Sequence, residues 1–365
     1  MTTLEKHADA NVDKAADFER QLFAAVLRSR TGALTGLSRL LRFQTGTKGF
    51  EREYNRQLPL IGGLRTAYWE QVKECLPKNG LRLGIIDDSS VKKAGKKFPK
   101  QQIHHEHSDN TFYSGMKVLT SLVYQNGKAA AVSSRLVGKE DNKLEIATQD
   151  IDALIGGFSV GIFLFDAWYC KNPVLGHIAA QGKKFVSRIR KDSKVIVEGM
   201  EMQLAAYAGR LSHSDFRHVR IHGTSYWLYD AALEFAAYGK LRVIISKMGV
   251  HGKLFFIVTN ALNFTDKFVI SLYLTRFAIE VFFKDAKQFL NFETFQCRAP
   301  EKWELHLLLV NVLHWAIQKR NSISRTVRAI RESLEACQSY INRNLLLNAF
   351  FGSLRAHRGE LAENV

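Results

Sequence analysis

Four residues in one segment are spaced so that a helix would bring a carboxylate, two cations and a phenol together. In SLYLTRFAIEVFFKDAKQFL, Tyr273 is followed by Arg276, Glu280 and Lys287 at intervals of three, four and seven positions. At about 100° per residue, these side chains lie within roughly 60° of arc on a helix. The opposite face is apolar and should pack against a core; it comprises Leu272, Ile279, Phe283, Ala286 and Leu290. A solvated helix with an ion-pair ladder would show the same pattern, so the spacing alone leaves both interpretations open.

Two predicted strands end in aspartate and supply further carboxylates. The run LGIIDD reaches Asp87 and Asp88, and GIFLFD ends at Asp166. Both runs are short and rich in Ile, Leu or Phe, which predicts buried strands. Because ligands collect at the carboxyl ends of strands in α/β sheets, we expect these aspartates to meet Glu280 if its helix packs across the sheet. Adjacent strand residues point to opposite faces, so at most one of Asp87 and Asp88 points into such a site.

A cluster of three carboxylates predicts a metal site, because their mutual repulsion is costly unless cations are bound. Hard oxygen ligands, with the remaining positions left to water and phosphate oxygens, suit Mg²⁺ or Mn²⁺ better than zinc. Two ions about 4 Å apart would activate an attacking oxygen and stabilise the leaving one in a displacement at phosphorus. The predicted chemistry is phosphodiester cleavage or strand transfer.

The composition points to a polyanionic partner. The 365 residues include 52 Lys plus Arg and 35 Asp plus Glu, a net charge of +17, which leaves nucleic acid and anionic membrane as candidates. The longest apolar run, LHLLLVNVLHWAI, is interrupted by His306, Asn311 and His314, so we expect neither secretion nor membrane insertion. The four cysteines are scattered without a CxxC pair, as in a reducing cytosolic compartment. No GxxxxGK[ST] motif is present, which predicts chemistry without a nucleotide cofactor.

The pattern along the chain is that of an α/β protein flanked by helical regions. Residues 1–78 read as helical, and we expect this region to bind DNA. From residue 79 to 320 the order is strand, hairpin, helix, strand, helix, strand, with Asn126-Gly127 typical of the tight hairpin turn. A β-rich insertion at about 193–265 precedes the helix of Glu280, and residues 321–365 are again helical.

The chain resembles the cut-and-paste insertion-sequence transposases of the DDE superfamily, in the branch with a Y-x2-R-x3-E-x6-K signature. SLYLTRFAIEVFFKDAK matches that signature at all four positions, while IIDDSSVKK and IFLFDAWYCK resemble the motifs around the first and second aspartates. The resemblance covers about residues 80 to 320. It implies an RNase H-like mixed sheet and a β-rich insertion that contacts DNA.

The resemblance also implies the roles of the acidic residues. Asp88, Asp166 and Glu280 would be the catalytic triad and would bind two Mg²⁺ or Mn²⁺ ions. Asp88 is chosen over Asp87 because the aspartate of the family usually precedes Ser or Thr, which leaves Asp87 a structural role.

Tyr273, Arg276 and Lys287 would hold DNA near the scissile phosphate. Their chemistry suits this role: Arg clamps phosphate with two hydrogen bonds, Lys supplies a point charge, and Tyr stacks on a base or donates to a backbone oxygen. The expected partners are double-stranded DNA, as transposon ends and target, and a second copy of the chain in a homodimer. The expected setting is the prokaryotic cytoplasm, associated with the nucleoid.

Two other functions fit the same residues less well. A transposase-derived DNA-binding protein without catalysis would not need intact acidic residues, and a nuclease of this fold would not need basic terminal regions and a large insertion. Two local alternatives also stay open. Trp227 either packs in the core or stacks on a base. The lysines of the run 92–100 either are solvated or contact phosphate.

Overall fold

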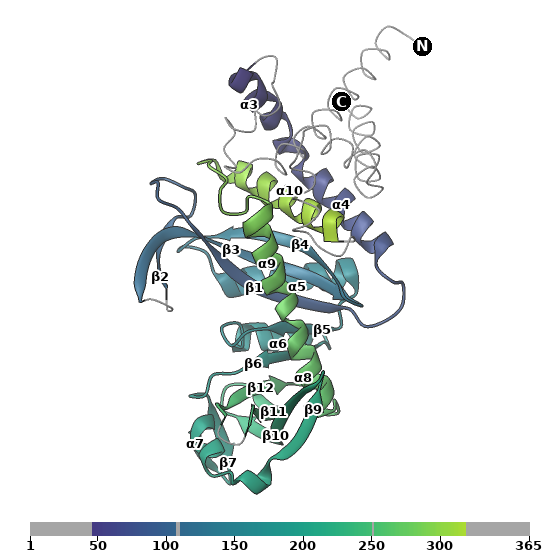
Figure 1. Cartoon of the computed structure of the whole chain (residues 1–365), viewed down its shortest axis with the longest axis vertical. Helices are drawn as coiled ribbons and strands as arrows, with labels where there is room; N and C mark the ends of the chain where they lie inside the picture. Colours follow the sequence, from purple (N-terminus) through teal and green to yellow (C-terminus); the bar gives the residue numbers. More distant parts are fainter. Residues whose placement is uncertain (1–45, 107–109, 250–251, 319–365) are drawn as a thin grey trace.

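The computed structural model describes residues 46–106, 110–249 and 252–318. Its centre is a mixed sheet of twelve strands with helices on both faces (Figure 1). The strands that begin this sheet are β1 (Leu83–Lys92), β2 (Gln102–Glu106), β3 (Thr111–Gln125), β4 (Lys128–Val137), β5 (Ile162–Phe165) and β6 (Lys184–Arg188).

The central part of the sheet has the strand order of an RNase H-like fold. β4, β3, β1, β5 and β6 are neighbours in that order. β1, β5 and β6 run parallel, whereas β3 is antiparallel to β1 and to β4. The connections contain α5 (Lys143–Phe158) and α6 (Asn172–Ala180). The predicted α/β class and RNase H-like core are therefore confirmed.

The turn between β3 and β4 forms as the dipeptide Asn126-Gly127 predicts. Asn126 has φ 49° and Gly127 has φ 79°, and a type I′ turn requires positive φ at both central residues. The hairpin then pairs Gln125 with Lys128 and continues to Lys117 opposite Val137, with one irregularity after Ser121.

The strands of the β-rich insertion continue the central sheet. They are β7 (Lys194–Val197), β8 (Met200–Gln203), β9 (Arg217–Ile221), β10 (Thr224–Phe235), β11 (Gly239–Lys247) and β12 (Phe255–Thr259), with the short helix α7 (Leu204–Gly209). β12 is antiparallel to β11 on one side and to β6 on the other. Hydrogen bonds therefore connect the insertion to the core without a break.

Helices from both ends of the described chain pack together. α3 (Gly46–Arg56) and α4 (Ile61–Cys75) precede β1, and α8 (Asp266–Thr275), α9 (Phe277–Phe289) and α10 (Pro300–Gln318) follow β12. α9 crosses in front of the sheet, α5 lies behind it, and α10 runs along β4 and contacts α4 (Figure 1). The helices predicted before residue 46 and after residue 318 lie outside the described residues.

The long apolar run before residue 318 becomes a helix of the core. In α10, residues 302–317 are all buried except Glu304, and two of its polar side chains make hydrogen bonds inside the protein. Asn311 Oδ1 accepts a hydrogen bond from Ser134 at 3.0 Å, and His306 Nε2 donates to the carbonyl of Asn291 at 3.0 Å. Among the described helices, none is both long enough and apolar enough to span a membrane.

His306 should make the fold sensitive to acid. Burial is the main cause that lowers the pKa of His306 from 6.5 to about 4. Between pH 6.5 and about pH 4, His306 is protonated in the unfolded chain but stays neutral in the folded protein. The free energy of unfolding therefore falls as the pH drops below 6.5 and levels off near pH 4. We expect a loss of about 2 kcal/mol between about pH 7.5 and about pH 5, measured by urea unfolding. His306→Gln, which keeps an N–H donor, should remove this part of the pH dependence; equal slopes in both proteins would contradict it.

Candidate active site

The parallel register of β1 and β5 places two aspartates side by side. Ile85 of β1 pairs with Leu164 of β5. Asp87 lies two residues after Ile85, and Asp166 lies two residues after Leu164. Because the strands are parallel, these two side chains face the same side of the sheet. Their charges interact, and both side chains are partly exposed.

Arg276 joins this pair to the predicted glutamate. Its Nη1 donates to Asp87 Oδ2 at 3.1 Å and its Nη2 donates to Glu280 Oε1 at 2.5 Å. The side chain of Arg276 is 9% exposed, whereas that of Glu280 is 46% exposed. Asp87, Asp166, Arg276 and Glu280, hereafter the Arg276 cluster, thus lie where α9 crosses the middle of β1 and the end of β5. The prediction that the first strand ends at its aspartates was wrong, because β1 stays paired with β3 as far as Lys92.

The helix predicted across residues 273–287 is divided into two at Arg276. Tyr273 belongs to α8, Arg276 lies at the junction, and Glu280 and Lys287 belong to α9. At the junction the hydrogen bonds tighten to three-residue steps, from Arg276 N to Tyr273 O and from Ile279 N to Arg276 O, each 3.1 Å. The expectation of a single regular helix was therefore wrong. The apolar face predicted for it is buried as expected, at Leu272, Ile279, Phe283, Ala286 and Leu290.

Asp88 points to the opposite face of β1, toward the start of α5. Its Oδ1 accepts hydrogen bonds from Lys143 Nζ and, at 2.7 Å, from the Tyr169 hydroxyl, and its Oδ2 lies 3.1 Å from Lys117 Nζ. Burial by itself raises the pKa of Asp88, but the two ammonium groups outweigh it and hold that pKa below its usual value. Lys143 also lies 3.2 Å from the ring centroid of Trp168. The structure therefore places Asp88 outside the Arg276 cluster.

Two lysines fix α9 and the segment after it to β1. Lys287 Nζ donates to the carbonyl of Ser90 at 2.9 Å and pairs with Glu293 at 2.8 Å. Lys93 Nζ donates to the carbonyls of Glu293 and Phe295 at 2.5 and 2.7 Å. These bonds fix the position of α9, which carries Glu280, relative to β1, which carries the two aspartates.

The charge balance around Asp87 differs from that around Asp88. Burial, followed by the negative charge of Asp166, raises the pKa of Asp87 to about 7. The backbone N–H of Asp88 and the guanidinium of Arg276 oppose this rise without cancelling it. An additional cation beside Asp87 would therefore be stabilised.

The chemistry of these side chains fits a divalent metal, although their arrangement is not that of a finished site. Carboxylate oxygens are the ligands that Mg²⁺ and Mn²⁺ prefer. Within residues 46–318, outside the two gaps, no three His, Cys, Asp or Glu side chains are arranged to hold one ion. The guanidinium of Arg276 instead bridges two of the carboxylates and acts as the local cation.

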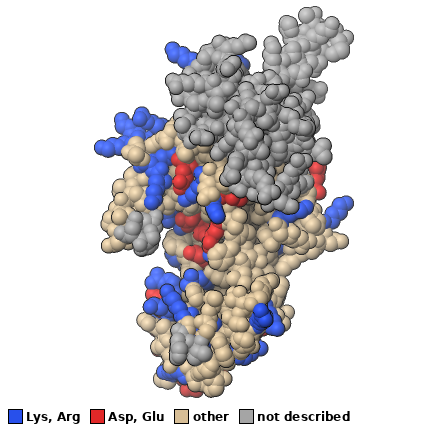
Figure 2. Space-filling view, in the orientation of Figure 1, with Lys and Arg blue, Asp and Glu red and all other residues tan. Residues whose placement is uncertain are grey.

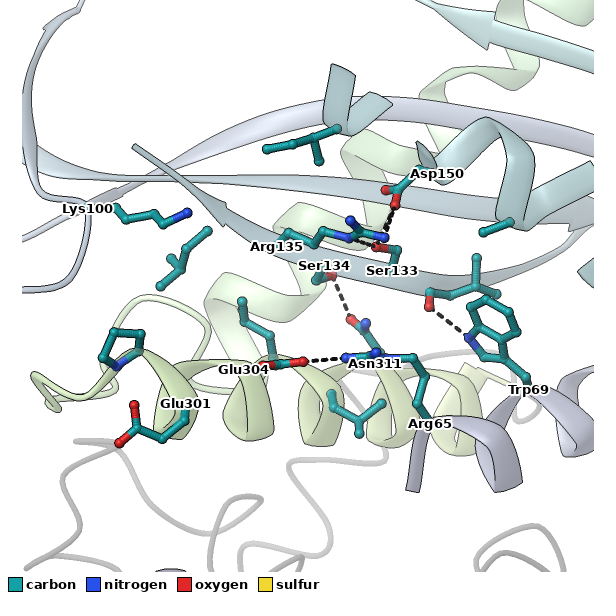
Figure 3. A pocket seen from close by; sticks show the side chains of 17 residues that line it. Arg65, Trp69, Lys100, Ser133, Ser134, Arg135, Asp150, Glu301, Glu304 and Asn311 are labelled. Carbon is teal, nitrogen blue, oxygen red and sulfur yellow. Dashed lines mark hydrogen bonds and ion pairs between the residues drawn. The ribbon is translucent and has the colours of Figure 1, made fainter. Parts of the chain in front are cut away.

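A cavity lies away from the Arg276 cluster and is lined by none of its residues. It measures about 700 Å³ and is lined by residues of α4, β4, α5 and α10. Four of its charged side chains pair with one another: Arg135 with Asp150 at 2.9 Å, and Arg65 with Glu304 at 2.5 Å (Figure 3). Lys100, which also lines the cavity, pairs with Asp141 at 2.6 Å. Each cation in the lining therefore already has a carboxylate partner.

The surface around α9 combines both signs of charge. Figure 2 shows acidic side chains gathered in the middle of this face, near α9, with Lys and Arg above and below them. An acidic centre between basic flanks suits a substrate that brings both phosphates and metal ions.

An RNase H-like sheet whose aspartates are opposed by a glutamate-bearing helix is the arrangement that the resemblance to DDE transposases implies. The family model described as "Transposase DDE domain" matches residues 78–316. The chain therefore belongs to the DDE transposases, whose substrate is DNA. A comparison with curated proteins finds no match to this chain.

The structure brings together part of the predicted site and adds residues that the sequence did not indicate. Asp166, Arg276 and Glu280 meet in one cluster, Tyr273 lies with its ring centroid 5.6 Å from the Arg276 guanidinium, and Lys287 binds β1. The partners of Asp88 were missed. They are Lys117, Lys143 and Tyr169. Tyr169 lies three residues after Asp166 in the motif IFLFDAWYCK, which was the available signal.

Proposed function

We propose that this protein is the transposase of an insertion sequence in the branch with the Y-x2-R-x3-E-x6-K signature. It binds the inverted-repeat ends of its element, cuts them and joins them to target DNA, acting as a homodimer that pairs two ends. The observation that best supports this proposal is that Arg276 joins Glu280 to Asp87 of β1, whose charge interacts with that of Asp166.

The metal-binding carboxylates in this proposal are Asp166, Glu280 and one aspartate of β1, for which the sequence motif favours Asp88. When bound, two Mg²⁺ or Mn²⁺ ions supply an activated attacking oxygen and stabilise the leaving oxygen. The fixed position of α9 on β1 keeps the carboxylates in place.

The remaining signature residues bind DNA in this proposal. Arg276 offers a planar pair of donors to a phosphate, and the Tyr273 ring lies beside the guanidinium, with its centroid 5.6 Å away. Lys287 places its charge beside the end of β1, where the DNA backbone would pass. In the structure both cations are paired with carboxylates, so DNA binding exchanges these partners for phosphates.

The proposal is tested with the DNA that flanks this gene. A plasmid carrying both flanks is incubated with the purified protein and Mg²⁺, and a plasmid with scrambled flanks serves as control. We expect cleavage at the two flanks that disappears when EDTA removes the metal. Binding to the flanks without cleavage in Mg²⁺ or Mn²⁺ would favour the second candidate, a transposase-derived DNA-binding protein. Cleavage without preference for the flanks would favour a nuclease.

A further inference from the structure

We infer that Asp87 is the aspartate of β1 that binds metal together with Asp166 and Glu280, and that Arg276 competes with the metal for these carboxylates. This inference rests on the proposed function and replaces the choice of Asp88 that the sequence motif favours. It concerns residues whose contacts differ sharply although they are neighbours in the chain.

The two faces of β1 separate the aspartates. Side chains alternate along a strand, so Asp88 shares a face with Gly84, and Asp87 faces the other way. A Cβ on Gly84 would lie 3.2 Å from Leu154 of α5, which identifies the Asp88 face as the α5 face. Arg276, at the start of α9, reaches Asp87 instead. Asp87 therefore shares the face on which Glu280 lies.

Asp88 is poorly suited to a divalent cation. Its two oxygens are already occupied by two ammonium groups and a hydroxyl. A doubly charged ion at Asp88 would be repelled by Lys143 and Lys117. The side chain of Lys143 is 9% exposed, so a metal ion that displaced it from Asp88 would leave a buried positive charge without its ion-pair partner.

The cation that pairs with Asp87, by contrast, can move to another partner. Arg276 supplies one positive charge to Asp87 and Glu280 together. Its Nε is buried and has no hydrogen-bond partner among the described residues, so the guanidinium can gain a bond by moving to another acceptor. A phosphate oxygen is the acceptor whose geometry a guanidinium matches best. A DNA phosphate would draw Arg276 away and leave its two carboxylates to the metal, so DNA and metal should strengthen each other's binding.

Two variants that each remove one positive charge test this inference by Mn²⁺ titration calorimetry on the full chain without DNA. Arg276→Gln removes the cation that pairs with Asp87, and Lys143→Gln removes one of the two ammonium groups that pair with Asp88. We expect Arg276→Gln to bind Mn²⁺ about ten-fold more tightly than wild type, and Lys143→Gln to change the affinity less than about three-fold. A larger gain from Lys143→Gln, or no gain from either variant, would overturn the inference.

Removal of each carboxylate gives a second comparison. In the Arg276→Gln background, Asp87→Asn should weaken Mn²⁺ binding at least about ten-fold, and Asp88→Asn less than about three-fold. A greater loss of Mn²⁺ affinity from Asp88→Asn than from Asp87→Asn would assign the metal to Asp88. Thermal melting shows whether each variant folds; if Asp88→Asn does not, the comparison of Arg276→Gln with Lys143→Gln decides alone. Because the titrations need no cleavage, their failure is distinct from the failure of the plasmid assay.

Discussion

Replacing Glu280 with glutamine should lower DNA cleavage by at least about 100-fold, equivalent to about 2.7 kcal/mol of barrier, and leave DNA binding near that of wild type. Glutamine keeps the size of the side chain but removes the charge that a metal ligand needs. The Glu280 side chain is 46% exposed, so its ion pair with Arg276 contributes at most about 1 kcal/mol to folding. Rates of cleavage and affinity for the flanking DNA are measured on the same protein preparation.

Glu304→Gln is the matched control for Glu280→Gln. Glu304 is 50% exposed and pairs with Arg65 in the cavity behind β4, away from the Arg276 cluster. We expect this variant to cleave like wild type. If Glu280→Gln lost DNA binding and cleavage together, Glu280 would be a structural or DNA-binding residue and not a metal ligand.

Replacing Trp303 with alanine should destabilise the fold by about 3 to 5 kcal/mol, the usual range for a buried aromatic residue. The Trp303 side chain is fully buried, its Nε1 donates to the carbonyl of Cys297 at 2.8 Å, and its ring meets that of Phe295 at 5.1 Å. Lys93 Nζ lies 5.0 Å from the ring centroid. Alanine leaves a cavity beside the segment that follows α9 and removes one hydrogen bond. Urea unfolding at neutral pH measures the loss.

Trp168→Ala provides the comparison for Trp303→Ala. Trp168 is 41% exposed and its ring contacts the Lys143 ammonium, a cation–π contact that contributes about 0.5 to 1 kcal/mol at an exposed site, so its replacement should cost much less than that of Trp303. Equal losses from the two variants would mean that the segment after α9 does not contribute to the core as the structure indicates.

Local patterns in the sequence predicted most elements of the fold. The turn at Asn126-Gly127 forms because those two residues adopt positive φ readily. The buried strand before Asp166 and the apolar face of α9 follow from hydrophobic periods of their own segments. Such features depend on neighbours in the chain, so no knowledge of long-range packing was needed.

The site itself depended on contacts that the sequence does not display. Which of Asp87 and Asp88 faces α9 follows from the register of β1 against β5, and that register is set by the whole sheet. The partner Lys143 lies on a helix far along the chain.

The lysine run after β1 shows the same limitation. It was expected to be either solvated or bound to phosphate, but the Lys93 residue is 4% exposed and binds backbone carbonyls. Lys100 in the same run pairs with Asp141 at 2.6 Å. Neither general interpretation of the run applies to these two residues.

The β-rich insertion and the core form one continuous hydrogen-bonded sheet. β10 pairs with β11, β11 with β12, β12 with β6, and β6 with β5, whose last residue precedes Asp166. In the function proposed above, DNA bound by the outer strands would therefore contact a sheet that continues by backbone hydrogen bonds to the strand before Asp166.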